Sequence, residues 1–149
     1  QIAVARGVAQ GRAGVLIDVR EDNASALLEY ARGYSARLHA SWTHWKNEFL
    51  FDIFGTDGFL SVNGLGGSYG KSSLTVGLRK NSGGAPALQK MSFAGWEESL
   101  RREWLDFVSG ITLRRKYMGA AQEGLSAMRT LDALYRSDKL KSFVKLQGD

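Results

Sequence analysis

The sequence predicts an α+β domain, in which a mostly antiparallel open sheet of six or seven strands carries helices packed on one face. Two observations predict this class. In the first half of the chain, apolar and polar residues alternate in short runs that glycine-containing turns separate. In the second half, apolar residues recur at every third or fourth position, which is the period of an amphipathic helix. The length of 149 residues suits one domain, which we expect to span residues 1–149.

The chain begins with β-type runs. Residues 2–8 and 15–19 flank a glycine turn at residues 11–14 and predict a hairpin. Residues 26–31 predict a short strand. Residues 34–42 alternate strictly, which predicts a strand with one buried apolar face. The residues on that face are Tyr34, Ala36, Leu38, Ala40 and Trp42.

The middle of the chain predicts a second group of strands. In residues 49–54 only Asp52 interrupts the apolar run, so both faces of this strand are largely apolar. Such a strand is expected where a second layer or a partner subunit covers the sheet. The Asp-Gly pair in residues 55–58 is a strong hairpin signal, which makes residues 59–63 the return strand. Residues 74–78 alternate again and predict a further strand.

Two helices follow a loop of small residues at positions 80–86. We expect the first helix to end at Gly110, a suitable C-terminal cap, and the second to end before Ser137. Residues 142–146 predict a last strand. The apolar stripes consist of Trp96, Leu100, Trp104 and Phe107 in the first helix and of Ala121, Leu125, Met128, Leu131 and Tyr135 in the second.

Composition excludes several functional classes. The chain has no cysteine, which excludes disulfides, iron–sulfur clusters and a cysteine nucleophile, and which fits a reducing, cytoplasmic location. No run approaches the roughly 20 apolar residues that a membrane span requires, so no membrane partner is expected. The net charge of +5 is scattered along the chain. We therefore expect a solvated basic surface rather than nucleic-acid binding.

The two histidines predict no metal site. His39 and His44 are five residues apart in an extended segment, which would place them on opposite faces of one strand. Zinc sites need further ligands, and the sequence has no His-Glu-x-x-His motif. It also has no Gly-x-Ser-x-Gly elbow, so serine-hydrolase chemistry is not expected.

The glycine-rich residues 64–70 do not predict a nucleotide site. A Walker A loop requires glycine where Leu65 stands, and a dinucleotide fingerprint requires glycine where Tyr69 stands. Both motifs also need a helix next, because the helix N-terminus holds the phosphates. Residues 73–79 instead alternate like a strand, so the glycines are expected to form a loop between strands.

The segment of residues 42–48 is the most unusual stretch. Trp42 and Trp45 lie beside His44 and Lys46, close to a strand end. An apolar plate next to hydrogen-bond donors is typical of sugar-binding surfaces. The alternative is that Trp42 belongs to the core and Trp45 packs at an interface.

Several segments in a fixed order resemble the C-terminal domain of the glucose–fructose oxidoreductase, inositol dehydrogenase and rhizopine-catabolism (Gfo/Idh/MocA) family. The resemblance covers nearly the whole chain. It rests most on the order of the segments around the Asp-Gly turn and the glycine loop. The similar segments are residues 21–24, 41–47, 51–58, 64–70, 96–111 and 124–137.

The resemblance implies a fragment of an NAD(P)-dependent dehydrogenase that acts on a sugar, cyclitol or related polyol. In that family an N-terminal Rossmann domain binds NAD or NADP. The C-terminal domain shapes the substrate pocket and forms homodimers or tetramers through its open sheet. The sequence begins with Gln1 and its first methionine is Met91, so we expect a fragment or a processed product. It lacks Gly-x-Gly-x-x-Gly, Glu-Lys-Pro and Asp-x-Gly-x-His. The resemblance therefore supplies no catalytic or cofactor-binding residue and implies that the isolated chain is inactive.

We expect Lys46, Tyr69, Trp45 and His44 to line the substrate pocket of the complete enzyme, with Lys46 and Tyr69 as the principal contacts. The competing interpretation is that these residues bridge subunits. The alternative function is a non-enzymatic dimerisation or carbohydrate- or protein-binding module built on the same sheet.

Overall fold

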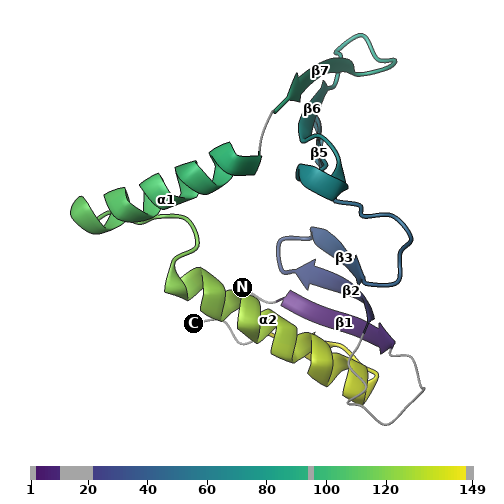
Figure 1. Ribbon diagram of the computed structural model, residues 1–149. Coiled ribbons are helices and arrows are strands. Elements are labelled where there is room, and N and C mark those ends of the chain that lie inside the picture. The colour runs from purple at the N-terminus through teal and green to yellow at the C-terminus, as the bar shows by residue number, and fades with distance from the viewer. Residues whose placement is uncertain (1–2, 11–21, 94–95, 147–149) are drawn as a thin grey trace. The chain divides into compact units, whose positions relative to one another are not determined.

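A computed structural model describes residues 3–10, 22–93 and 96–146. These residues form eight strands in two antiparallel four-stranded sheets, together with two long helices (Figure 1). The predicted α+β class with antiparallel strands is confirmed. The chain divides into two compact units. One combines the residues up to His44 with those from Gly119 onward, and the other runs from Trp45 to Met118.

The first unit contains four strands in the order β3-β2-β1-β8, all antiparallel, with helix α2 packed against β1 and β8. Its elements are β1 (Ala3–Gln10), β2 (Asn23–Tyr30), β3 (Ser35–Ser41), α2 (Ala121–Leu140) and β8 (Val144–Lys145).

The predicted strands of the first unit are confirmed with changed limits. The predicted strand at residues 26–31 begins earlier, at Asn23, and the predicted last strand is shortened to Val144–Lys145. β1 pairs with β2 on one side and with β8 on the other. The predicted hairpin partner at residues 15–19 lies outside the described residues.

Small side chains let α2 approach the sheet of the first unit. Ala133 and Ser137, one turn apart on α2, are buried, as are Ala26 and Leu28 of β2 and Val144 of β8. The prediction of a helix packed on one face is therefore confirmed for this sheet. The predicted apolar face of β3 is not fully buried. Its Tyr34 and Leu38 remain about half exposed, because β3 is the edge strand and α2 packs on β1 and β8.

Helix α2 continues past its predicted end. The Ser137 hydroxyl donates a 2.7 Å hydrogen bond to the Ser142 carbonyl oxygen, so this serine stays in the helix and fastens the following turn. Lys141 then ends the helix in the left-handed conformation, with φ of 51°. At the other end, the Glu123 carboxylate accepts hydrogen bonds from the backbone N–H groups of Gly119 and Ala120.

The second unit contains four strands in the order β4-β5-β6-β7, a short 3₁₀ turn and helix α1. Its elements are β4 (Leu50–Phe54), β5 (Gly58–Asn63), η1 (Gly67–Tyr69), β6 (Ser73–Leu78), β7 (Ala87–Ser92) and α1 (Trp96–Thr112).

The predicted Asp-Gly hairpin joins β4 to β5. It is closed by a 2.8 Å hydrogen bond from the Gly55 N–H to the Gly58 carbonyl oxygen. The predicted loop at residues 80–86 is also confirmed, but the chain then returns as β7, which the sequence did not predict. The apolar Leu88 and Met91 of β7 are three residues apart and so lie on opposite faces. The period-two signal is therefore absent there, and only pairing with β6 defines the strand.

The strand register gives the second sheet two different faces. One face has the polar row Asp52, Ser61, Thr75 and Lys90, one residue from each strand, and near it the apolar residues Leu50, Phe54, Phe59 and Leu88. The opposite face, the apolar face of the second sheet, has apolar residues in all four strands, and several remain about half exposed within this chain. Its large residues are Phe51, Ile53, Leu60, Val62, Leu74, Val76, Leu78 and Met91.

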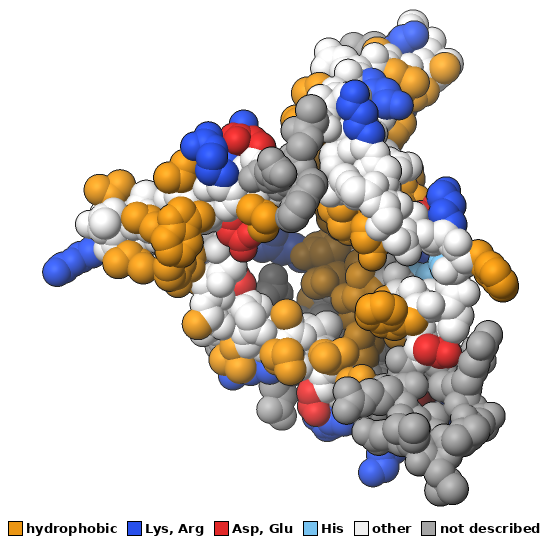
Figure 2. Space-filling view, in the orientation of Figure 1, with side chains coloured by type: hydrophobic (Ala, Val, Ile, Leu, Met, Phe, Trp, Pro, Cys, Tyr) orange, Lys and Arg blue, Asp and Glu red, His pale blue; other side chains and the backbone are white. Residues whose placement is uncertain are grey.

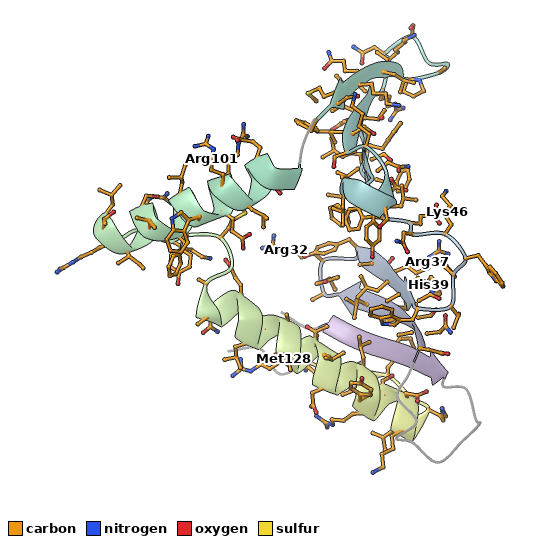
Figure 3. All side chains as sticks on the ribbon, viewed as in Figure 1. Arg32, Arg37, His39, Lys46, Arg101 and Met128 are labelled. Atoms are coloured by element: carbon orange, nitrogen blue, oxygen red, sulfur yellow. The ribbon has the colours of Figure 1, made fainter. Side chains whose placement is uncertain are left out.

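Helix α1 has a charged side and an exposed apolar side (Figure 2). On the charged side, Glu98 accepts hydrogen bonds from Arg101 and Arg102, which lower the pKa of this carboxyl to about 2. Arg101 extends from α1 in Figure 3. The large exposed apolar residues of this helix are Leu100, Trp104, Leu105, Phe107, Val108 and Ile111.

The prediction that Gly110 caps α1 is wrong, because the helix runs two residues further, to Thr112. Gly110 is buried, and a Cβ at this position would lie 2.5 Å from Cδ1 of Tyr117. The Tyr117 ring also packs edge-on against Phe107, with ring centroids 5.2 Å apart. The glycine thus makes room for an aromatic ring instead of ending the helix.

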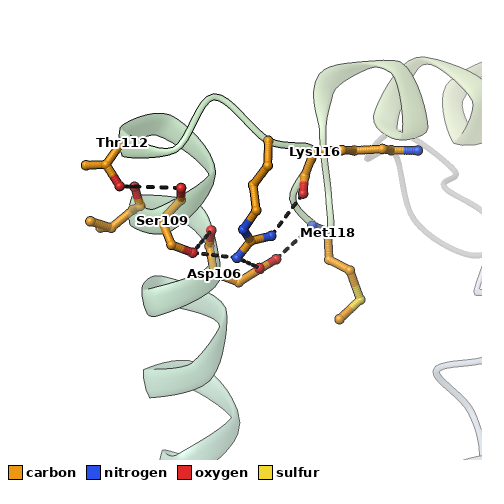
Figure 4. Close-up of polar contacts among 7 residues, drawn as sticks. Asp106, Ser109, Thr112, Lys116 and Met118 are labelled. Atoms are coloured by element: carbon orange, nitrogen blue, oxygen red, sulfur yellow. Dashed lines mark hydrogen bonds and ion pairs between the residues drawn. The ribbon is translucent and has the colours of Figure 1, made fainter.

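Asp106 holds the end of α1 to the segment that follows it (Figure 4). Its carboxylate accepts a 2.9 Å hydrogen bond from the Met118 N–H and a 2.6 Å charged hydrogen bond from Arg115. Arg115 also donates to the Ser109 hydroxyl and to the Lys116 carbonyl oxygen. The Met118 hydrogen bond, followed by the Arg115 hydrogen bond, lowers the pKa of Asp106 below its usual value.

We expect Asp106→Asn to lower the thermal unfolding midpoint near pH 7, because the neutral amide binds the Arg115 guanidinium less strongly. A lowered pKa means that the carboxylate stabilises the fold above its unfolded pKa. That contribution is lost as the pH falls through the folded pKa. Melting curves of both proteins should therefore converge in acid. Glu103→Gln, the same charge change at an exposed position of α1, is the control. Equal midpoints at pH 7 would refute the assigned role of Asp106.

Candidate functional site

A polar cluster turns the chain sharply after β3. The side-chain oxygen of Asn23 accepts hydrogen bonds from the Ser41 hydroxyl and, at 3.0 Å, from the Thr43 hydroxyl. The Thr43 N–H donates to Ser41 Oγ at 3.2 Å, and the Asn23 amide donates to Asp22 at 2.8 Å. The segment that carries the predicted site residues therefore leaves the strand at Ser41.

The two tryptophans of this segment lie on the surface of the chain. Trp42 lies beyond the end of β3 and is 90% exposed, so it does not belong to the core of the described chain, contrary to the alternative interpretation. Trp45 is fully exposed. Each indole thus presents a flat apolar plate to solvent, as a sugar-binding surface requires.

The prediction that His39 and His44 lie on opposite faces of a strand is wrong. The turn after Ser41 brings the His44 ring back over β3, so that its Nε2 lies 3.4 Å from Nε2 of His39. On the other side of the His39 ring, Nδ1 lies 2.9 Å from the Ser25 hydroxyl. His39 and Arg37 both extend from β3 (Figure 3).

Lys46 begins the second unit as an exposed cation. Its side chain is 82% exposed, and its Nζ lies 3.8 Å from Oε1 of Glu48. An exposed ion pair at this distance is weak, because water and salt screen it. The ammonium group is therefore available to donate hydrogen bonds to a ligand.

Tyr69 lies in the loop that the glycines form between β5 and β6. The loop is closed by a 2.8 Å hydrogen bond from the Gly66 N–H to the Gly70 carbonyl oxygen, and Tyr69 ends the 3₁₀ turn η1. Gly64 has φ of 76°, and a Cβ there would lie 2.6 Å from the Lys71 carbonyl oxygen, so only glycine fits. The strand β6 follows, as predicted, so no helix N-terminus is present here to hold a phosphate.

One hydrogen bond brings the Lys46 segment next to the Tyr69 loop. The side-chain amide of Asn47 donates to the Ser68 hydroxyl at 2.8 Å. Asn47 directly follows Lys46, and Ser68 directly precedes Tyr69. The Gly64 N–H also donates to the Phe49 carbonyl oxygen at 3.0 Å, which fixes the base of the loop.

The structure thus divides the four predicted site residues between the two units. Trp45, Lys46 and Tyr69 belong to segments that meet at one end of the second sheet, whereas His44 pairs with His39 in the first unit. The sequence reasoning missed Asn47 and Ser68 as positioning residues. Leu50, the first residue of β4, pairs with Asn63, the last residue of β5. A correct prediction of this register would therefore have placed the segment before β4 and the loop after β5 at the same end of the sheet.

The described residues also limit the kind of site. In residues 3–10, 22–93 and 96–146, no three histidine, cysteine or acidic side chains are grouped as metal ligands. Neither helix of the described chain combines the length and apolar character needed to cross a bilayer.

Comparison with known proteins agrees with this architecture. Residues 3–146 match the family described as "Oxidoreductase family, C-terminal alpha/beta domain". Levoglucosan dehydrogenase, solved with NADH and L-sorbose, aligns over 100% of this chain at 16% identity, with a TM-score of 0.84. An oxidoreductase domain protein from Kribbella flavida aligns over 99% of this chain at 16% identity, with a TM-score of 0.81. An NAD binding oxidoreductase from Klebsiella pneumoniae aligns over 99% at 17% identity, with a TM-score of 0.80.

The chain spans less than half of these three structures, namely 46%, 45% and 46% of their lengths. No functionally curated protein matches it significantly. At these identities the solved structures establish the fold alone. The match over residues 3–146 shows that the chain belongs to the C-terminal α/β domain family of the Gfo/Idh/MocA-type oxidoreductases.

Proposed function

We propose that this chain is the C-terminal substrate-pocket and oligomerisation domain of an NAD(P)-dependent oxidoreductase that acts on a sugar, cyclitol or related polyol. The observation that carries the proposal is the family match over residues 3–146. The similar structures support it, since one of them is named as a complex with NADH and levoglucosan. Under this proposal a Rossmann domain elsewhere in the protein supplies the cofactor site, and the cofactor accepts or donates the hydride.

This chain's part in the reaction is to hold and orient the polyol. Lys46 and Tyr69 can donate hydrogen bonds to hydroxyl groups, and the Asn47–Ser68 hydrogen bond ties the two segments that carry them. Trp45 offers an exposed indole face to the C–H groups of a sugar ring. Hydride transfer requires the substrate domain to hold the carbinol carbon of the polyol in one orientation.

The coding sequence upstream of Gln1 tests the proposed function. A Gly-x-Gly-x-x-Gly motif after a predicted strand, followed by Glu-Lys-Pro, would support it. The complete protein should then reduce NAD⁺ or NADP⁺ when a panel of sugars and cyclitols is supplied. If no polyol in the panel supports dinucleotide reduction, the proposed activity is wrong.

The isolated 149-residue chain is expected to bind neither NADH nor NADPH and to convert no sugar. The reason is the loop at residues 64–70, which leads into a strand and so lacks the helix N-terminus that holds a pyrophosphate. Fluorescence titration of both dinucleotides against the purified chain is the measurement. Saturable binding in the micromolar range would contradict this expectation.

The apolar face of the second sheet is the surface we propose for self-association. Apolar residues occur in all four strands and stay partly exposed within one chain, as expected of a face that a partner subunit covers. Light scattering at micromolar concentration should report a dimer or larger species. Leu60→Lys should shift the protein toward the monomer, whereas Ser61→Lys, on the opposite face of β5, should not. A monomer at every concentration would refute the proposal.

The alternative function is a carbohydrate-binding module without catalysis, and the exposure of Trp42 and Trp45 favours it specifically. Such a module would bind a sugar without the remainder of an oxidoreductase. Titration of the isolated chain with sugars, followed by tryptophan fluorescence, separates the two functions. Saturable binding that Trp45→Ala abolishes would favour the module.

A further inference from the structure

We propose that His39 and His44 form a binding site for a divalent transition metal, Zn²⁺ or Cu²⁺. The inference rests on the first unit alone and is independent of the proposed oxidoreductase function. Neutral imidazole nitrogens are ligands that both metals prefer.

The separation of the two histidines matches that of neighbouring ligands on one ion. Their Nε2 atoms are 3.4 Å apart, which is longer than an ordinary hydrogen bond. A tetrahedral Zn²⁺ with Zn–N distances of about 2.05 Å places its nitrogen ligands about 3.3 Å apart. The ring centroids are 5.2 Å apart, so the rings diverge from the point where their Nε2 atoms face each other. An ion can therefore bind both nitrogens with little movement of the backbone.

The Ser25 hydroxyl can accept the Nδ1–H of His39, which is the tautomer that leaves Nε2 free to bind a metal. Ser25 lies directly opposite His39 in the β2–β3 register, and its hydroxyl is 2.9 Å from His39 Nδ1. If Nδ1–H donates to this hydroxyl, the lone pair of Nε2 points toward His44. His44 is exposed, so its own Nδ1–H can be hydrated while its Nε2 binds the ion.

The turn that returns His44 to β3 is held in place before any ion arrives. Asn23 accepts hydrogen bonds from both Ser41 and Thr43, and the Trp42 N–H donates to the Asp22 carbonyl oxygen at 2.7 Å. A preformed turn reduces the conformational entropy lost on binding.

The surroundings indicate an open site of moderate affinity. No third histidine, cysteine or acidic ligand groups with the pair among the described residues, so water or an oxygen of a bound molecule would complete the coordination. Arg37 lies two residues before His39 on the same strand face and adds a positive charge that weakens cation binding. The pair therefore fits a site whose remaining coordination positions are exchangeable.

The chain itself, purified without a polyhistidine tag, provides a clean test because His39 and His44 are its only histidines. Zn²⁺ is titrated while the proton NMR signals of the imidazole rings are followed, and Cu²⁺ binding is followed by its visible absorption. We expect saturable one-to-one binding that shifts the signals of both rings together. His39→Asn and His44→Asn should each weaken binding by about tenfold or more, and Ser25→Ala by less.

Thr43→Val, which keeps both histidines but removes a hydrogen bond of the turn, should also weaken binding. Far-UV circular dichroism of each variant checks that the fold is intact. The proposal is overturned if neither metal binds saturably, if only one histidine responds, or if the double variant His39→Asn/His44→Asn binds as well as the original chain.

Discussion

Under the proposed function, replacing Lys46 with alanine in the complete protein should lower kcat/KM for a polyol substrate by about tenfold or more. Tyr69→Phe should lower it by up to about tenfold, and neither variant should change the oligomeric state. A hydrogen bond from a charged donor such as Lys46 contributes about 1.5–3 kcal/mol, and one from a neutral donor such as the Tyr69 hydroxyl contributes about 0.5–1.5 kcal/mol. A difference of about 1.4 kcal/mol corresponds to a factor of ten. Lys46 is exposed and only weakly paired with Glu48, so a substrate hydroxyl can become its main partner. Tyr69→Phe removes only the phenolic hydroxyl and keeps the ring, so its effect isolates the hydrogen bond.

Steady-state kinetics and light scattering on the same samples separate a pocket role from a subunit contact. Lys71→Ala is the matched control, because Lys71 is an exposed lysine two residues after Tyr69. A larger KM with unchanged kcat would place the lost contact in substrate binding, and equal losses in kcat and kcat/KM would place it in the transition state. Normal kinetics in both variants, or activity lost only through dissociation, would remove these residues from the pocket.

The parts of the fold that the sequence predicted are those that neighbouring residues determine. Residues 74–78 alternate, and β6 forms there. The Asp-Gly pair needs no distant partner to favour a hairpin, and the turn forms between β4 and β5. β7 lacks alternation and exists because β6 offers a free edge, so its sequence alone could not reveal it.

The errors near the site have a different cause, because distant side chains decide the local structure. Asn23 ends the extended run at Ser41 by accepting hydrogen bonds from residues 18 and 20 positions later. The alternation of apolar and polar residues along residues 34–44 gives no sign that the distant Asn23 side chain accepts these hydrogen bonds. A distant side chain also explains the error at Gly110. Glycine often caps helices, which led to the prediction of a helix end there, but this glycine is needed because the Tyr117 ring occupies the space of a side chain.

The assignment of Trp45, Lys46 and Tyr69 to a substrate pocket stays a prediction, and the sequence could single these residues out because their chemistry is concentrated in short segments. Trp45 and Lys46 are adjacent, and Tyr69 stands in a conspicuous glycine loop. The hydrogen bond between Asn47 and Ser68 joins groups 21 residues apart, so it required the three-dimensional structure. Residue types can indicate which chemistry is present, whereas strand register decides which of those residues meet.

The largest stability effect is expected at the hairpin, where Gly58→Ala should destabilise the fold by about 3 kcal/mol. Gly58 has φ of 156°, and an added Cβ would overlap the Gly77 carbonyl oxygen while lying 3.1 Å from the carbonyl carbon of Gly77 and 3.3 Å from Cα of Leu78. All three are backbone atoms of β6, which pairs with β5, so the clash cannot be relieved by turning a side chain. The strands must separate or the hairpin must change its register.

Gly55→Ala in the same turn is the matched control for this substitution. Its Cβ would meet only the Gly58 carbonyl oxygen, at an ordinary contact distance of 3.7 Å, and Gly55 is not among the residues with positive φ. A compatible glycine-to-alanine change restricts the unfolded chain and typically stabilises a protein by about 0.4–1 kcal/mol. Urea unfolding of both variants should therefore move the midpoint in opposite directions. If Gly58→Ala unfolds at the same urea concentration as the original chain, the close approach of β5 and β6 at this turn does not exist in solution.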